Sequence, residues 1–119
     1  MKNISKNLQM FNQVCKETNV IYHDYAAKNG ISDTAFWIMY SVYYYGEGIT
    51  QKNICEEWFY SAQTVNSSLK TMEKNGLIIL EPSNDNKKEK QIHFTKEGLL
   101  LAEKIIKPVI EAEKQSFEQ

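Results

Sequence analysis

One segment of the chain, residues 35–45, is apolar or aromatic at nearly every position. Its apolar members are Ala35, Phe36, Trp37, Ile38, Met39, Tyr40, Val42, Tyr43, Tyr44 and Tyr45. A helix that is apolar around its whole circumference has to be covered from several sides. We therefore expect a central core helix here, with Ser32 as its N-cap, Asp33 in its first turn and a break at Gly46.

The same aromatic side chains allow a second interpretation, the wall of a ligand pocket. Pockets for small molecules are lined mostly by apolar and aromatic groups. The candidate lining residues are Tyr22, Trp37, Tyr40 and Tyr44. Such a wall would suit a small aromatic effector. Core packing and ligand binding both stay open for these residues.

The length and composition indicate one globular domain. The chain has 119 residues, of which 42% are hydrophobic and 24% charged, close to the average of globular proteins. No apolar run approaches the ~18–20 residues that cross a bilayer, and no apolar run of a secretory signal follows the first lysines. Two cysteines, Cys15 and Cys55, form neither a zinc pattern nor a disulfide framework. We expect a soluble cytoplasmic protein without a membrane partner.

The charge pattern limits how the chain could bind nucleic acid. The net charge is −1, and all fourteen basic residues are lysines. Without arginine, the chain lacks the bidentate guanidinium fork that reads guanine or grips phosphate. A DNA-binding interpretation therefore depends on where individual lysines lie and not on the overall charge.

Residues 3–29 carry the apolar stripe of a long helix. At alternating spacings of four and three residues, the stripe runs through Ile4, Leu8, Phe11, Cys15, Thr18, Tyr22 and Tyr25. A stripe that continues for about three heptads is long enough to face a partner helix. The helix packs either on its own domain or on a second copy of the chain, and Asn29 with Gly30 ends it.

Two short helices with a tight turn between them are predicted next. Thr50 is suited to cap the first, over residues 51–58, and Ser61 to cap the second, over residues 62–75. The second helix has an apolar face of Val65, Leu69 and Met72 and a polar face of Gln63, Thr64, Asn66, Ser67 and Lys70. This pattern predicts a helix-turn-helix.

The rest of the chain predicts a β-hairpin and a last helix. Residues 77–80 are apolar, residues 91–94 alternate polar and apolar, and lysines lie in the loop between them. Thr95 is suited to cap the last helix, which we expect to kink near Ile106 because Pro108 lies inside its apolar pattern. Four helices, a hairpin and a helix, in this order, make a winged helix, which is mainly α with a small β-hairpin.

Three blocks of the sequence resemble the MarR family of bacterial transcriptional regulators. They are residues 49–54 (ITQKNI), residues 61–78, which end in MEKNGLI, and residues 92–98 (IHFTKEG). The last block is similar to the family's strand followed by Leu-Thr-Glu-Lys-Gly. With the long first helix, the resemblance covers nearly the whole chain. It implies a winged helix-turn-helix with long N- and C-terminal dimerisation helices.

The resemblance also implies a homodimer that represses transcription from a pseudopalindromic operator in double-stranded DNA. If the aromatic residues wall a pocket, a small aromatic ligand would release this operator. It assigns residues 1–30 and 96–119 to dimerisation helices and residues 31–95 to a DNA-binding lobe, with the wing at 77–94, all in a single domain of residues 1–119. The recognition helix would contact DNA through Ser61, Gln63, Thr64, Asn66, Ser67 and Lys70. The wing and the start of the helix-turn-helix would contribute Thr50, Gln51, Lys52, Asn86, Lys87, Lys88 and Lys90.

The chain departs from the family in having no arginine. The recognition helix has Ser67, and the wing has Lys88, where family members often carry arginine. Lysine neutralises phosphate but is a poorer probe of a narrow minor groove. Together with the near-neutral charge, this departure leaves open a winged-helix protein-interaction module that does not bind DNA.

The sequence carries no catalytic signature, neither Gly-x-Ser-x-Gly nor a phosphate-binding glycine loop nor His-Glu-x-x-His, so we expect no enzyme and no cofactor. His23 and His93 lie on different predicted elements, and we expect no metal site. Cys15 resembles the first-helix cysteine of the family's peroxide-sensing branch, so a Cys15-based peroxide sensor is a further alternative. Its place on the apolar stripe favours an inert buried thiol, and Cys55 is expected to pack in the core.

Overall fold

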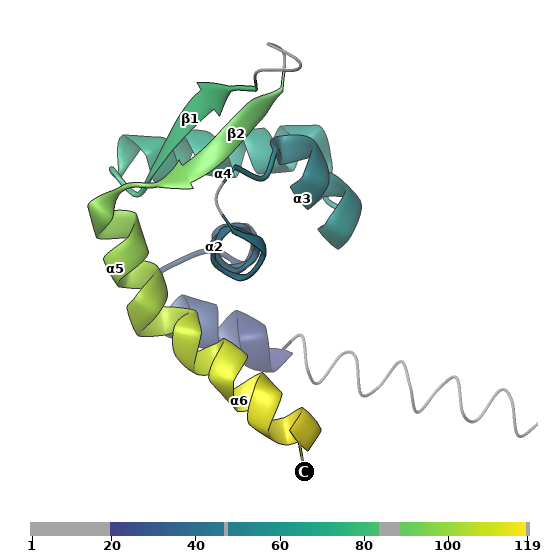
Figure 1. Ribbon diagram of the computed structural model, residues 1–119, viewed down its shortest axis with the longest axis vertical. Coiled ribbons are helices and arrows are strands. Elements are labelled where there is room, and N and C mark those ends of the chain that lie inside the picture. The colour runs from purple at the N-terminus through teal and green to yellow at the C-terminus, as the bar shows by residue number, and fades with distance from the viewer. Residues whose placement is uncertain (1–19, 47, 84–88, 119) are drawn as a thin grey trace, which may run out of the picture. The chain divides into compact units, whose positions relative to one another are not determined.

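The computed structural model describes residues 20–46, 48–83 and 89–118 (Figure 1). The chain divides into two compact units, Met1–Asp33 and Thr34–Gln119. In the first unit, residues 20–28 are helical. The helix ends as predicted: Gly30 has a φ of +76°, and the N–H of Ile31 bonds to the carbonyl of Ala26. The earlier part of the predicted stripe, including Cys15, lies outside the described residues.

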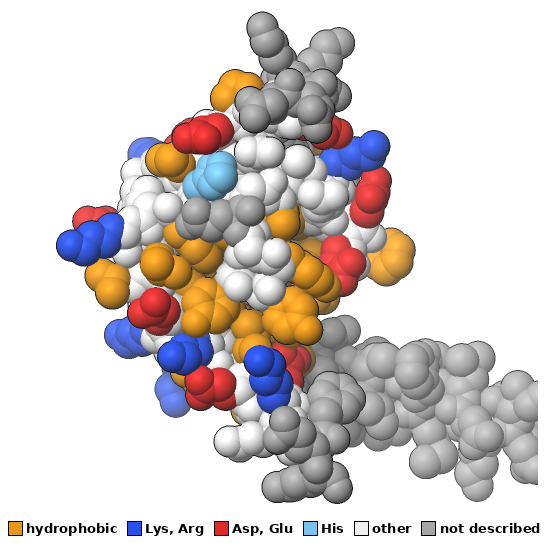
Figure 2. Space-filling model, viewed as in Figure 1, with side chains coloured by type: hydrophobic (Ala, Val, Ile, Leu, Met, Phe, Trp, Pro, Cys, Tyr) orange, Lys and Arg blue, Asp and Glu red, His pale blue; other side chains and the backbone are white. Residues whose placement is uncertain are grey.

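Helix α2 (Asp33–Tyr45) begins at the predicted residue, with Asp33 in its first turn. Its core face is fully buried and consists of Phe36, Ile38, Met39 and Val42. These buried residues fit the expected core helix, whereas Tyr44 and Tyr45 in its last turn are about half exposed. Figure 2 shows hydrophobic side chains gathered around the end of α2 that faces the viewer.

Helices α3 (Gln51–Trp58) and α4 (Ala62–Lys74) form the helix-turn-helix, and both predicted N-caps are confirmed. The Thr50 hydroxyl accepts a bond from the N–H of Asn53, whose side-chain oxygen accepts one from the N–H of Thr50. The Ser61 hydroxyl accepts a 3.1 Å bond from the N–H of Thr64. Each helix therefore starts at a fixed residue.

The inward face of α4 is the predicted one, since Val65, Leu69 and Met72 are buried. In the turn before α4, Phe59 has a φ of +59° and is 92% exposed. Sequence analysis gave no sign of this left-handed residue.

Strands β1 (Ile78–Pro82) and β2 (Lys90–Phe94) form the antiparallel hairpin, with Ile78 opposite Phe94 and Pro82 opposite Lys90. The residues before α3 also join this sheet, which was not predicted. The N–H of Ile92 bonds to the carbonyl of Ile49 at 2.9 Å. This pairing attaches the wing to the start of α3.

The last predicted helix is two helices, α5 (Lys96–Ile105) and α6 (Lys107–Glu118), separated at Ile106 as Pro108 led us to expect. Thr95 caps α5 as predicted, with its hydroxyl accepting a bond from the N–H of Gly98. In the part of the chain that the structure describes, no helix is both long and apolar enough to cross a membrane.

Candidate nucleic-acid interface

The outer face of α4 presents the polar side chains that the sequence analysis assigned to DNA. All are exposed, namely Ser61, Gln63, Thr64, Asn66, Ser67 and Lys70. They face outward because the buried apolar residues occupy the other side of the helix. Among the described residues, the side chains of Gln63, Asn66 and Lys70 have no hydrogen-bond or ion-pair partner. These three side chains are therefore available to an external partner.

The start of α4 is held by side-chain bonds. The Ser61 hydroxyl donates a 2.9 Å bond to the hydroxyl of Thr64, in addition to capping the helix. From α3, the amide of Gln51 donates a 3.1 Å bond to the carbonyl of Ala62. Gln51 thus orients the first turn of α4, a role that sequence reasoning missed because nothing local relates the two positions.

The remaining predicted DNA contacts lie around α4. Lys52 is exposed on α3, Lys90 is exposed at the start of β2, and half-buried Thr50 is engaged in its capping box. Figure 1 shows the hairpin lying alongside α4. The wing-tip candidates Asn86, Lys87 and Lys88 lie outside the described residues.

The aromatic residues of α2 pack on one another and on Trp58 of α3. The rings of Trp37 and Trp58 stack with centroids 4.4 Å apart, and those of Tyr40 and Tyr44 stack at 5.8 Å. The hydroxyl of Tyr40 donates a 2.7 Å bond to Glu113 of α6. Three of the four predicted pocket residues thus belong to one aromatic cluster joining α2, α3 and α6. The fourth, Tyr22, is half-buried on the helix of the first unit.

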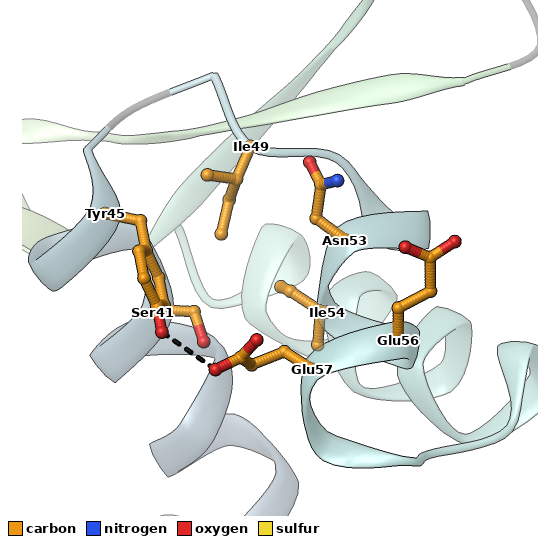
Figure 3. A pocket seen from close by; sticks show the side chains of 7 residues that line it. All are labelled: Ser41, Tyr45, Ile49, Asn53, Ile54, Glu56 and Glu57. Atoms are coloured by element: carbon orange, nitrogen blue, oxygen red, sulfur yellow. Dashed lines mark hydrogen bonds between the residues drawn. The ribbon is translucent and has the colours of Figure 1, made fainter.

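A pocket of about 360 Å³ lies between α2 and α3 (Figure 3). It is lined by Ser41, Tyr45, Ile49, Asn53, Ile54, Glu56 and Glu57, and by none of the four residues predicted for a pocket. The Tyr45 hydroxyl donates a 2.8 Å bond to Glu57. This bond, more than burial or the nearby charge, raises the pKa of the Tyr45 phenol. Sequence reasoning missed the pocket because its walls come from two separate helices.

Other reactive side chains are kept apart. His23 pairs with Asp33 at 2.8 Å, and His93 lies 3.5 Å from Glu81. Within the described ranges, no three histidine, cysteine or acidic side chains gather as metal ligands would. Burial, more than the charge of a neighbouring acid, raises the pKa of the half-buried Cys55 thiol, which favours an unreactive packing residue.

Sequence comparison decides the family. A family model described as "MarR family" matches residues 29–89, just over half of the chain. The chain belongs to the MarR family. The match confirms the relationship inferred from the three sequence blocks. No curated protein matches the chain.

Solved structures of the MarR family share this fold. NMB1585, a MarR family regulator from Neisseria meningitidis, is 21% identical with a TM-score of 0.77, over 99% of this chain and 80% of that one. S. aureus MepR in its DNA-binding conformation is 20% identical with a TM-score of 0.81, over 95% and 83%. A MepR mutant bound to an oligodeoxyribonucleotide is 20% identical with a TM-score of 0.65, again over 95% and 83%. The fold is the MarR winged helix, mainly helical with a small hairpin.

Proposed function

We propose that this MarR-family chain is a transcriptional regulator that binds double-stranded DNA through α4, the start of α3 and the wing. The observation that carries the proposal is the outer face of α4, where the side chains of Gln63, Asn66 and Lys70 are exposed and form no hydrogen bond or ion pair with another described residue. In a helix-turn-helix, the first turns of the second helix enter the major groove. Side-chain amides there can bond adenine through N6 and N7 together.

The other candidate residues take positioning and anchoring roles in this proposal. Ser61, Thr64 and Gln51 set the start of α4, so their bonds within the chain fix the angle at which the reading face enters the groove. Five lysines would neutralise DNA phosphates, namely Lys52, Lys70, Lys87, Lys88 and Lys90. Thr50, Asn86 and Ser67 complete the proposed contact surface. The fold similarity to MepR, solved in its DNA-binding conformation, supports this arrangement.

We also propose that the regulator is a cytoplasmic homodimer that represses transcription by occupying a pseudopalindromic operator. The dimer would form through residues 1–30 and 96–119 of one domain, with residues 31–95 binding DNA. In support, α5 exposes Leu99 and Leu100, which are 40% and 57% accessible and which a second copy would cover. Two copies related by a two-fold axis match a palindromic site. The protein would act by reversible binding and not by catalysis.

A small aromatic ligand at the aromatic cluster of Trp37, Tyr40, Tyr44 and Trp58 would release the operator in this proposal. The cluster joins α3 of the helix-turn-helix to α6 through the bond from Tyr40 to Glu113. A ligand that separates these rings would change how α3 packs on α2 and, through Tyr40, its link to α6, and so favour one spacing of the recognition helices.

The second candidate function is a winged-helix module that binds another protein. The net charge of −1 and the absence of arginine favour it. The two functions differ in salt dependence, since each phosphate that a protein neutralises lowers log K by about 0.9 per unit of log salt concentration.

The experiment is a titration of the full chain with the noncoding duplex beside its own coding region, at two salt concentrations. We expect tighter binding to this duplex than to a scrambled one, and a steep loss with salt. Lys70→Ala should reduce the salt slope, whereas Lys74→Ala, in the last turn of α4 and outside the proposed contacts, serves as the matched control. If the chain binds neither duplex at low salt, the protein-interaction module is the better assignment.

A further inference from the structure

We propose that the pocket between α2 and α3 binds a small organic cation with a flat apolar body. Figure 3 shows that the lining side chains come from both helices and from the segment that joins them. Glu57 extends from α3 toward Tyr45 of α2, and Glu56 stands at the outer edge on α3. The chemistry of the lining selects the ligand class.

The floor of the pocket is apolar and one wall is aromatic. Ile54 is fully buried beneath it, and Ile49 is half-buried on the connecting segment. Tyr45 is 54% exposed, and its ring forms the wall on the α2 side. The volume of about 360 Å³ lies within the usual ~300–1,000 Å³ of ligand pockets. A flat ring would lie on the isoleucines against the tyrosine, whose face also attracts a positive charge.

The hydroxyl protons of the lining are already used inside the protein. Ser41 donates to the carbonyl of Trp37 at 2.8 Å and accepts from the indole of Trp58. Tyr45 donates to Glu57. Of the other polar lining residues, Asn53 carries an amide whose oxygen accepts from the N–H of Thr50, and Glu57 and Glu56 carry carboxylates, whose oxygens only accept hydrogen bonds. A ligand that satisfies them has to bring its own N–H donors.

The charge of the lining residues also favours a cationic ligand. Neither Glu56 nor Glu57 forms an ion pair with a lysine or histidine of the described residues. Two carboxylates without an ion-pair partner among the described residues favour a cation and repel an anion. An amidinium or guanidinium group fits best, because its parallel N–H bonds match a carboxylate.

The position of the pocket connects it to the DNA-binding elements. Asn53, in its wall, closes the capping box with Thr50 at the start of α3. Ile49, in its floor, bonds through its carbonyl to Ile92 of β2. A ligand held between α2 and α3 therefore contacts residues that fix both the helix-turn-helix and the wing. An effect on operator affinity rests on the proposed function, whereas binding of the cation does not.

The test uses three ligands with one body and different charges: benzamidinium, neutral benzamide and benzoate. Isothermal titration of the full chain should show benzamidinium binding, benzamide binding about tenfold more weakly, and no binding of benzoate. Glu57→Gln should weaken benzamidinium binding about tenfold, because it removes the charge but keeps an acceptor for Tyr45. Glu73→Gln, an exposed carboxylate on α4 outside the pocket, is the matched control and should change nothing.

Equal affinity for the three ligands, no binding of benzamidinium, or full affinity in Glu57→Gln would overturn the inference. A second titration measures operator affinity with and without benzamidinium. A chain that binds benzamidinium but no DNA would refute the proposed function and leave the cation site standing. A chain that binds DNA but not benzamidinium would refute the cation site alone.

Discussion

The indole N–H of Trp58 donates a 2.6 Å hydrogen bond to the hydroxyl oxygen of Ser41. Ser41 lies inside the apolar run of α2, is 2% exposed, and donates its own proton to the carbonyl of Trp37. The ring of Trp58 also stacks on that of Trp37. The buried hydroxyl of Ser41 therefore links the end of α3 to the middle of α2 by a hydrogen bond, next to the aromatic cluster.

Ser41→Ala should destabilise the fold because it leaves the indole N–H of Trp58 without its acceptor. Leaving such a group unpaired costs about 1–3 kcal/mol. Urea unfolding followed by tryptophan fluorescence measures the loss. Ser67→Ala, on the exposed face of α4, should change stability by no more than about 0.5 kcal/mol. Equal stabilities of the two variants would show that the Trp58 bond contributes nothing.

Gly98→Ala should be strongly destabilising. A Cβ at this position would lie 1.9 Å from the carbonyl oxygen of Leu77, so α5 and the start of the hairpin would have to move apart. Overpacking of this kind costs at least about 1–3 kcal/mol. Thermal unfolding checks the prediction, with the exposed Glu103→Ala on the same helix as the control. An unchanged melting temperature for Gly98→Ala would mean that this corner is loosely packed.

The features predicted correctly from sequence are those determined by neighbouring residues. Thr50, Ser61 and Thr95 all cap helices as predicted, because a cap depends on a side chain and an N–H three residues later. The separation of α5 from α6 follows in the same way from Pro108. Periodicity likewise gave the buried face of α4.

The features that sequence analysis missed join residues far apart in the chain. The bond from Trp58 to Ser41 and the pairing of Ile92 with Ile49 have no local signal. For the candidate site, the polar face of α4 was predictable, but the bond from Gln51 that orients it was not. An apolar run identifies α2 as a core helix without saying which of its tyrosines face solvent.

Tyr45 should titrate at unusually high pH because of its bond to Glu57, which raises the pKa of the phenol in the folded chain. A folded pKa above the unfolded value of about 10 means that the folded state holds this proton more tightly. The contribution to stability is therefore complete below pH ~10 and is lost as the pH rises through the folded pKa. Glu57→Gln should lower the pKa of Tyr45.

The absorbance of tyrosinate measures this titration. The curve of the Tyr45→Phe variant is subtracted, both with Glu57 and with Gln at that position, so that the signal of one phenol among seven remains. If the pKa of Tyr45 is the same with and without the carboxylate of Glu57, the hydrogen bond is not formed in solution.

Leu100→Asp should convert the proposed dimer into a monomer. Leu100 is 57% exposed in the single chain, so the substitution leaves the fold intact, but a carboxylate buried unpaired at a dimer seam is costly. Sedimentation equilibrium measures the mass. Ile79→Asp, at an exposed position of β1, is the matched control and should remain dimeric. A dimer that tolerates aspartate at both Leu99 and Leu100 would exclude α5 from the seam.

Substitutions at Asn66 and at Lys52 should distinguish base recognition from phosphate binding. Asn66 follows buried Val65 and is exposed in the N-terminal half of α4, the part of the helix that enters the groove. Asn66→Ala should cost about 1–3 kcal/mol on the operator and little on a scrambled duplex. Lys52→Ala should weaken binding to both duplexes alike and flatten the salt slope by about 1 per subunit, and Lys88→Ala should do the same from the wing.

Affinities on both duplexes at two salt concentrations make this comparison. Helix content and dimer mass should be unchanged in Asn66→Ala and Lys52→Ala, since both side chains are exposed. If Asn66→Ala loses as much affinity for scrambled DNA as for the operator, α4 contacts the backbone without reading bases. If neither variant loses affinity for any duplex, the exposed amides of α4 bind a protein partner and not DNA. The chain has no arginine, so a DNA-binding surface on it needs both the amide of Asn66 and the charge of Lys52.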